Sequence, residues 1–128
     1  MMKKLLLLLF SLLISFNSNG EWKGLIESAD GQQSYYVDVD TIKESGRYVY
    51  WWDLGDSKKL VGKSLSIKSY GEGDCAVNRY RTLSRILYKQ RMGKGKGDRS
   101  NPQFQGWTYP VPGSINKAIL DFVCDYVN

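Results

Sequence analysis

The stretch GEGDCAVNRYRTLSRILYKQRMGKGKG, residues 71–97, decides the fold of this chain. It contains Cys75, one of only two cysteines, and the densest run of positive charge, and it ends in a glycine-lysine loop. The segments before it have the alternating pattern of β-strands, and a Pro/Gly-rich connection after it leads to a short C-terminal helix that carries Cys124. We therefore expect a disulfide between Cys75 and Cys124 that ties this helix to a sheet.

The N-terminus has the pattern of a secretory signal peptide. Two lysines precede an apolar run from Leu5 to Phe16, which at about 12 residues is too short to span a membrane, and small residues follow at Ser18 and Gly20. We predict a signal peptide over residues 1–20 and a single domain over residues 21–128. No cysteine lies near the cleavage point, so we expect an exported protein with no transmembrane anchor and no lipid on an N-terminal cysteine. Its location would be the periplasm or the cell surface.

The composition restricts the chemistry that the chain can perform. Removal of residues 1–20 leaves 108 residues, the size of one domain, and lowers the net charge from +5 to +3, because Lys3 and Lys4 leave with them. The chain has no histidine, which excludes His-based triads and histidine metal ligands. Nothing in the sequence combines a nucleophile, a base and an orienting group. We therefore expect a protein that is not an enzyme, with no catalytic residue, no metal site and no cofactor.

Alternating patterns predict four strands before Cys75, the third of them central because aromatic and β-branched residues occupy both of its faces. These strands are expected at residues 22–28, 34–39, 47–54 and 60–70. Asp30-Gly31 between the first two is a hairpin signal. The intervening polar segments predict a helical turn or wide loop at residues 40–46, a turn at residues 53–59 and another at residues 71–74.

Residues 78–90 fit two periods. One set of side chains recurs at helical spacing, whereas another alternates as on one face of a strand. We favour the strand, whose second face would carry a basic row with apolar members: Arg79, Arg81, Leu83, Arg85, Leu87 and Lys89.

The remaining residues predict a loop, a short edge strand and a helix. Residues 93–106 lack any core-forming period, and proline at positions 110 and 112 would stop an edge strand at residues 106–110. Ser114 is a good N-cap for a helix with one apolar stripe that can lie on a sheet. The members of this stripe are Ile115, Ala118, Ile119, Phe122, Val123 and Tyr126.

Basic side chains form the first candidate binding site. Only Asp98 offsets them within residues 79–99, and such a cluster attracts and steers anionic partners. Acidic protein segments, sulfated or phosphorylated glycans and lipid head groups fit this charge, whereas nucleic acid is not expected in this compartment. The alternative is a solvated face that protects a strand edge from aggregation. The candidate residues are Arg79, Arg81, Arg85, Lys89, Arg91, Lys94, Lys96 and Arg99.

Aromatic side chains form the second candidate site. They are numerous for so small a sheet, and those that do not pack in the core could form an exposed platform for a ligand or partner. Tyr36, Tyr50 and Trp52 are the candidates for this platform. Core packing is the alternative role for the same side chains.

The order and spacing of several short motifs resemble the surface-adhesin Protein E family of exported Gram-negative bacterial proteins. The likeness covers essentially residues 21–128. The motifs that carry it are Tyr35-Tyr36-x-Asp38, the aromatic strand at 50–54, Lys63-Ser64 with Lys68, Gly73-Asp74-Cys75, Tyr80-Arg81-x-Leu83-Ser84, Met92-Gly93-x-Gly95, Trp107, Pro112-Gly113-Ser114 and Phe122-Val123-Cys124.

The resemblance implies an α+β fold: a twisted antiparallel β-sheet of about five to six strands, with a C-terminal α-helix packed on it and bonded to it through Cys75 and Cys124. It also implies an adhesin-like binding protein that recognises acidic host or envelope partners through its basic segment. The alternative is a periplasmic accessory protein that binds a small ligand, or inhibits an envelope enzyme, through the aromatic face.

Overall fold

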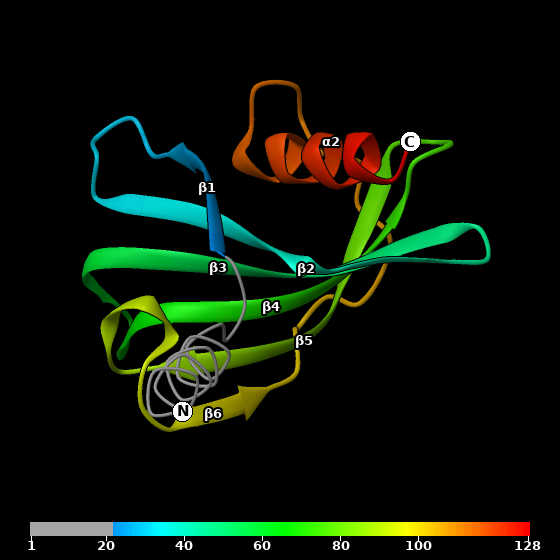
Figure 1. The fold of residues 1–128 in the computed structure, drawn as a ribbon. Helices are drawn as coiled ribbons and strands as arrows, with labels where there is room; N and C mark the ends of the chain where they lie inside the picture. Colours follow the sequence, from blue (N-terminus) through cyan, green and yellow to red (C-terminus); the bar gives the residue numbers. More distant parts are fainter. Residues whose placement is uncertain (1–21) are drawn as a thin grey trace, which may run out of the picture.

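The computed structural model describes residues 22–128 (Figure 1). The predicted signal peptide, residues 1–20, lies outside the described residues. Six antiparallel strands form one sheet in which each strand pairs with the next in sequence, and a C-terminal helix lies across one face (Figure 1). The elements are β1 (Trp22–Glu27), β2 (Gln33–Ser45), β3 (Tyr48–Val61), β4 (Ser64–Asp74), β5 (Arg79–Tyr88), a 3-10 turn η1 (Arg91–Gly93), β6 (Gly97–Ser100) and α2 (Ile115–Val127). The predicted fold class is therefore confirmed.

The strands are longer than their sequence pattern predicts. The turns expected at residues 40–46, 53–59 and 71–74 are wrong, because these residues lie almost entirely within β2, β3 and β4. Hydrogen bonding to neighbouring strands outweighs the low β-propensity of polar residues and glycine: residues 43–45 pair with β3 alone, and the other two segments have a partner strand on each side. The chain reverses instead at Gly46 and Gly62, whose φ angles of 60° and 63° suit glycine in tight turns.

The strand interpretation of residues 78–90 is confirmed, but the basic row predicted along it is wrong. Gly71 pairs with Thr82 and Tyr70 pairs with Ser84, so Leu83 is an extra residue, a β-bulge. The bulge reverses the alternation along β5. Arg79 and Arg81 consequently face away from α2, whereas Arg85 projects on the same face as the helix.

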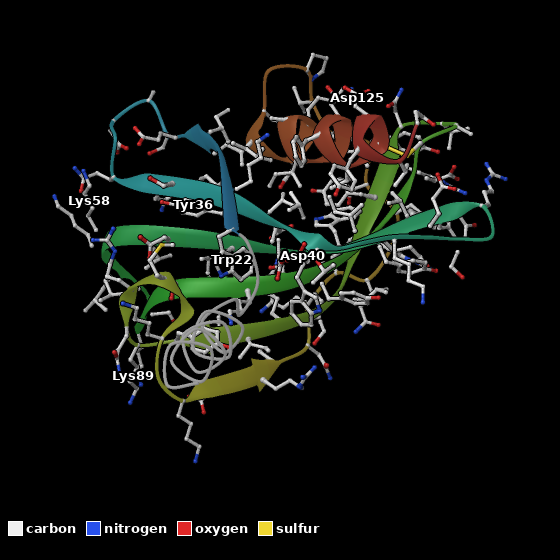
Figure 2. All side chains as sticks on the ribbon, viewed as in Figure 1. Trp22, Tyr36, Asp40, Lys58, Lys89 and Asp125 are labelled. Carbon is white, nitrogen blue, oxygen red and sulfur yellow. A yellow bond between two sulfur atoms is a disulfide. The ribbon has the colours of Figure 1, made fainter. Side chains whose placement is uncertain are left out.

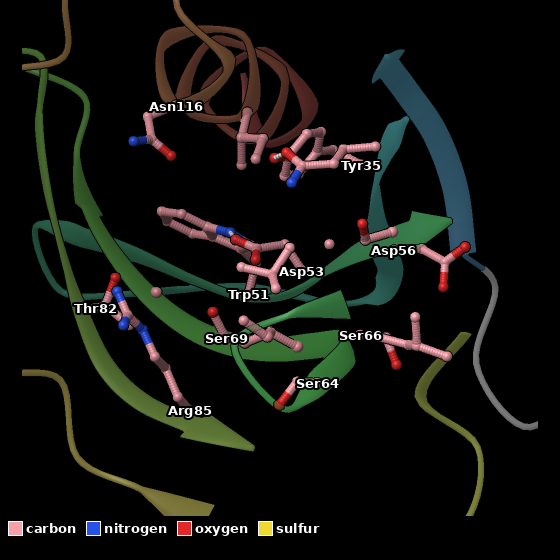
Figure 3. A pocket seen from close by; sticks show the side chains of 18 of the residues that line it. Tyr35, Trp51, Asp53, Asp56, Ser64, Ser66, Ser69, Thr82, Arg85 and Asn116 are labelled. Atoms are coloured by element: carbon pink, nitrogen blue, oxygen red, sulfur yellow. Dashed lines mark hydrogen bonds between the residues drawn. The ribbon is translucent and has the colours of Figure 1, made fainter. Parts of the chain in front are cut away.

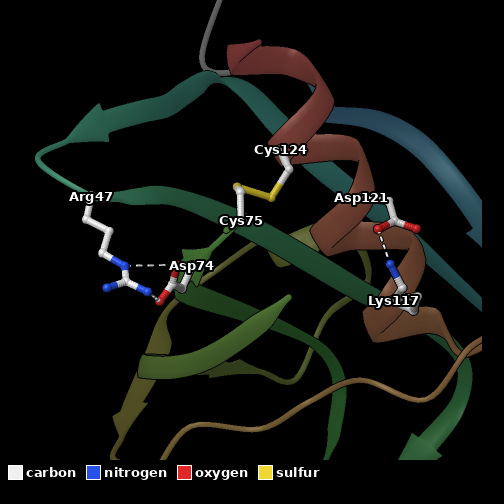
Figure 4. Close-up of a disulfide and its surroundings, with 6 residues drawn as sticks. All are labelled: Arg47, Asp74, Cys75, Lys117, Asp121 and Cys124. Atoms are coloured by element: carbon white, nitrogen blue, oxygen red, sulfur yellow. Dashed lines mark hydrogen bonds and ion pairs between the residues drawn. A yellow bond between two sulfur atoms is a disulfide. The ribbon is translucent and has the colours of Figure 1, made fainter. Parts of the chain in front are cut away.

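Helix α2 begins as predicted and closes the core. The Ser114 hydroxyl accepts a hydrogen bond from the backbone N–H of Lys117 at 3.2 Å, an N-cap. Leu120 and Val123 are fully buried against Val49 and Trp51 of β3. The predicted disulfide between Cys75 and Cys124 is present, with a Cα–Cα distance of 5.7 Å, and it fastens α2 to the residue that follows β4 (Figure 4).

The segment expected to be a long loop contains β6, which pairs with β5. The edge strand expected at residues 106–110 is reduced to a single bridge between Thr108 and Tyr80. Among residues 22–128, no helix combines the length and apolar character needed to cross a membrane.

Candidate functional site

Three of the eight predicted basic residues bind carboxylates that are buried. Arg79 contacts Asp74 at 3.1 Å. Arg81 contacts Glu72 at 2.6 Å, and Arg91 contacts Asp56 at 2.6 Å. The guanidinium groups of Arg79 and Arg81 also lie over the Trp107 ring, each 4.4 Å from its centroid. These three arginines therefore stabilise the sheet, and because a carboxylate already neutralises each of them, they attract an external anion less strongly.

Asp74 is the most enclosed of these carboxylates. Its side chain is fully buried, and Arg47 contacts it at 3.0 Å from the β2–β3 turn in addition to Arg79 (Figure 4). Burial by itself would raise the pKa of Asp74, but the hydrogen bonds and positive charges of Arg47 and Arg79 outweigh it and hold that pKa below its usual range. The carboxylate is thus a structural anion that joins two strand ends.

The other five predicted basic residues have no carboxylate within 4.0 Å in the part of the chain that the structure describes; they are Arg85, Lys89, Lys94, Lys96 and Arg99. All five are exposed. Arg99 donates a hydrogen bond to the Ser84 hydroxyl at 2.8 Å. Ser84 and Arg85 are adjacent in β5 and point to opposite faces of the sheet, so Arg85 lies on the face that α2 covers.

The fold brings the β3–β4 hairpin next to the loop after β5. The Ser66 hydroxyl donates to the Gln90 carbonyl at 2.6 Å and accepts from the backbone N–H of Gly93 at 2.8 Å. The loop is also attached to β3, since the N–H of Met92 and the side chain of Arg91 both donate to Asp56. Lysines of the hairpin and of the loop therefore lie at one end of the sheet.

We call this surface the basic end. Figure 2 shows Lys58 and Lys89 at this end of the sheet. Its members are exposed lysines that make no ion pair within residues 22–128: Lys58, Lys59, Lys63, Lys89, Lys94 and Lys96. Sequence reasoning missed the first three, because they precede the other three by more than 25 positions and only strand register brings them near.

The predicted aromatic candidates share the face of the sheet opposite α2. Trp52 and Tyr50 flank Tyr70 of β4, with ring centroids 5.1 and 6.0 Å from it. Tyr36 lies on the same face of β2, opposite Leu54 of β3. The Tyr50 hydroxyl donates to Glu72, and this hydrogen bond raises the pKa of Tyr50 to about 12. The row is half-buried, and sequence reasoning missed its central member, Tyr70.

A pocket of about 310 Å³ opens on the other face, between the sheet and the first turns of α2 (Figure 3). Its floor is formed largely by small residues, including Gly55, Ser69 and Gly71, which leave space above the sheet. Gly71 matters most, because a Cβ at this position would lie 2.5 Å from the Trp51 ring. The glycine therefore allows the indole of Trp51 to extend across β4.

Three charged residues line this pocket, Asp53, Asp56 and Arg85 (Figure 3). Strand pairing places Asp53 beside Ser69 and Ser69 beside Arg85, so the three form one row across β3, β4 and β5. Trp51 Nε1 donates to Asp53 Oδ2 at 2.8 Å. Burial raises the pKa of Asp53 to about 7, although this hydrogen bond and the charge of Arg85 oppose the shift.

The described residues offer no metal centre: among residues 22–128 no group of three or more cysteine or acidic side chains is placed to hold an ion.

The fold is a six-stranded antiparallel sheet with one helix fastened to it by a disulfide, and its surface carries the basic end, an aromatic row and a pocket. The family model for surface-adhesin protein E matches residues 22–125, and this chain belongs to that family.

Solved structures of Haemophilus influenzae protein E have the same fold. Its crystal form II superposes with a TM-score of 0.61 at 18% sequence identity, covering 83% of this chain and 91% of that one. A second structure of Haemophilus influenzae protein E has a TM-score of 0.62 at 16% identity, covering 81% of this chain and 83% of that one. No curated protein matches this chain by sequence.

Proposed function

We propose that this chain is an exported, adhesin-like protein that binds an acidic host or envelope partner through its basic end. Its membership of the surface-adhesin protein E family supports an adhesin-like role. The predicted signal peptide supports export, to the cell surface or the periplasm. The partner is a protein segment or glycan that carries several closely spaced negative charges.

The observation that carries this proposal is the convergence of six exposed lysines at one end of the sheet. Lysines in solvent repel one another weakly, but an anion that contacts several of them at once gains from each contact. The loop that carries Lys94 and Lys96 is held in place by hydrogen bonds to Asp56 and Ser66, so part of the surface is preorganised. A preorganised surface loses less entropy on binding.

The proposal is tested with heparin, a sulfated glycan, and with a polyglutamate peptide. We expect both to bind and to lose affinity steeply as salt rises from about 0.05 to about 0.3 M, because the Debye length shortens from about 14 Å to about 6 Å. The variant Lys94→Glu/Lys96→Glu should weaken both by about tenfold or more. Arg91 is unsuitable for reversal, because its loss would leave the buried Asp56 without its cation.

The matched control is Lys23→Glu/Lys43→Glu. It changes the net charge by the same amount as Lys94→Glu/Lys96→Glu, but both residues lie outside the basic end, Lys23 on β1 and Lys43 near the C-terminal end of β2. Equal losses in the two double variants would show that net charge alone drives binding and would refute the assignment to the basic end. Protease treatment of intact cells separately decides the location: digestion places the chain at the surface, and protection until the outer membrane is opened places it in the periplasm.

The aromatic row supports a second candidate, a periplasmic accessory protein that binds through Tyr36, Tyr50 and Trp52. The observation that supports this candidate is that Tyr70 contacts both Tyr50 and Trp52, so the three rings form one half-buried row. Binding that buries aromatic surface would change little with salt. Salt dependence therefore separates the two candidates.

A further inference from the structure

The pocket under α2 contains Asp53, a carboxylate that lacks, within the described part of the chain, the arginine partner found at the buried carboxylates elsewhere on the sheet. Asp56, Glu72 and Asp74 are buried, and each binds at least one arginine. Asp53 lies on the floor of the pocket and has no cation within 4.0 Å among residues 22–128. Only the indole N–H of Trp51 among those residues donates to it, which leaves acceptor capacity on the carboxylate.

The opposite wall of the pocket offers the complementary charge. Arg85 lies two strands away in the same row, with Ser69 between it and Asp53. Two strand spacings separate their backbones by about 10 Å. Thr82 and Asn116 supply further polar groups at that side (Figure 3). The aromatic rings of Tyr35 and Tyr80, which also line the pocket, supply apolar surface. A concave site with few convergent polar groups and apolar walls is typical of small-molecule binding.

We propose that this pocket binds a small zwitterion, with its ammonium group on Asp53 and its carboxylate on Arg85. The ligand would supply the cation that Asp53 does not receive from the described residues. For side chains that project in parallel from one row about 10 Å apart, a hydrogen bond of about 2.9 Å at each end leaves a few ångströms between the two charges of the ligand, the separation found in amino acids. The pocket is large enough for such a molecule and too small for a folded partner.

The raised pKa of Asp53 agrees with this geometry. The charged and titratable groups that share the pocket are Arg85 of β5, Tyr80 of β5, Tyr35 of β2 and Asp56 of β3. Burial raises the pKa of Asp53 to about 7, so near neutral pH an incoming ammonium group would draw the carboxyl into its ionised form.

The test uses the mature full-length chain and a series of probes. The zwitterions are glycine, β-alanine, γ-aminobutyrate and 6-aminohexanoate; butylamine and butyrate each carry one of the two charges. Binding is followed by NMR through the indole N–H of Trp51, which is bonded to Asp53. We expect one or more zwitterions to bind about tenfold more tightly than butylamine or butyrate, because each charge-assisted hydrogen bond contributes to affinity.

Two variants assign the charges. Asp53→Asn should weaken the best zwitterion and butylamine by about tenfold and leave butyrate unchanged, while Arg85→Gln should weaken the zwitterion and butyrate and leave butylamine unchanged. The amide of Asp53→Asn still accepts the hydrogen bond from Trp51, so the variant should fold. Arg99→Gln, an exposed residue of β6 outside the pocket, is the control.

Absence of binding across the zwitterion series, or an affinity unaffected by Asp53→Asn, would overturn the proposal. Equal binding of zwitterions and butylamine would also overturn it, because Arg85 would then have no role. None of the six lysines of the basic end lines the pocket, so polyanion binding of these variants is measured in parallel. Loss of one activity with retention of the other shows which of the two proposals has failed.

Discussion

The indole N–H of Trp51 donates a 2.8 Å hydrogen bond to Asp53 two residues further along the same face of β3. Trp51 is buried against the helix, whereas Asp53 borders the pocket. The bond therefore connects the hydrophobic core to the pocket, and a change at either residue should be detected at the other.

Asp53 should make the protein less stable as pH rises. Its pKa is raised to about 7 in the folded chain, while in the unfolded chain it has an ordinary value near 4. Between these values the folded state binds the additional proton, so the free energy of unfolding falls with increasing pH, by at most about 4 kcal/mol in total. Asp53→Asn should remove this fall and be more stable than the parent at pH 8.

Urea denaturation at pH 4.5, 6 and 8 measures the effect. Asp98→Asn, an exposed residue of β6, is the control and should retain the slope of the parent. An unchanged pH dependence in Asp53→Asn would mean that the carboxyl is ionised in the folded protein throughout this range.

Gly71→Ala should disturb the pocket and the core together. The added Cβ would lie 2.5 Å from the Trp51 ring, so the indole must move and its hydrogen bond to Asp53 is lost. Overpacking of this kind costs about 1–3 kcal/mol. Thermal unfolding and the Trp51 indole resonance measure the two effects.

Gly24→Ala provides the comparison for Gly71→Ala. Its Cβ would lie 3.4 Å from the Tyr36 ring, an ordinary contact, and its φ is not in the left-handed region. Equal stability losses in the two variants would contradict the steric explanation.

The disulfide should contribute a large part of the stability. It closes a loop with a sequence separation of 49 residues, which in the chain-entropy model corresponds to about 4 kcal/mol. Cys75→Ser/Cys124→Ser should therefore unfold at lower denaturant concentration. Reductant should destabilise the parent to the same level and leave the double variant unchanged; a double variant as stable as the oxidised parent would refute this contribution.

Asp74→Asn should destabilise the protein at neutral pH and much less in acid. Arg47 and Arg79 lose their shared anion, and the melting temperature should fall by about 10 °C. Because these arginines hold the pKa of Asp74 below its usual range, its contribution is present above about pH 4 and disappears as pH falls through the folded-state value.

Thermal scans at pH 7 and pH 2.5 test this prediction. The difference in melting temperature between the parent and Asp74→Asn should be smaller at pH 2.5 than at pH 7. Asp125→Asn, on the exposed side of α2, should leave the melting temperature nearly unchanged at both values.

Local features of the sequence were sufficient for the helix, its cap and several strands. Ser114 before an apolar stripe predicts where α2 begins, and Asp30-Gly31 between alternating runs predicts the first hairpin. Each of these signals lies within a few consecutive residues, so a short segment of the sequence is enough to recognise it. The two cysteines of an expected exported chain have only one intramolecular pairing, which made the disulfide predictable as well.

Only the tertiary structure decided what the charged residues do. The extra residue at Leu83 reverses the alternation of β5, so Arg81 binds Glu72 while Arg85 borders the pocket. The same register brings Lys58 near the loop after β5 and places Asp53 in one row with Arg85. Pairing between distant strands sets these neighbours, and backbone hydrogen bonds that form it are nearly independent of side-chain identity. Sequence patterns therefore determine which segments become strands, whereas the register between them determines which side chains meet.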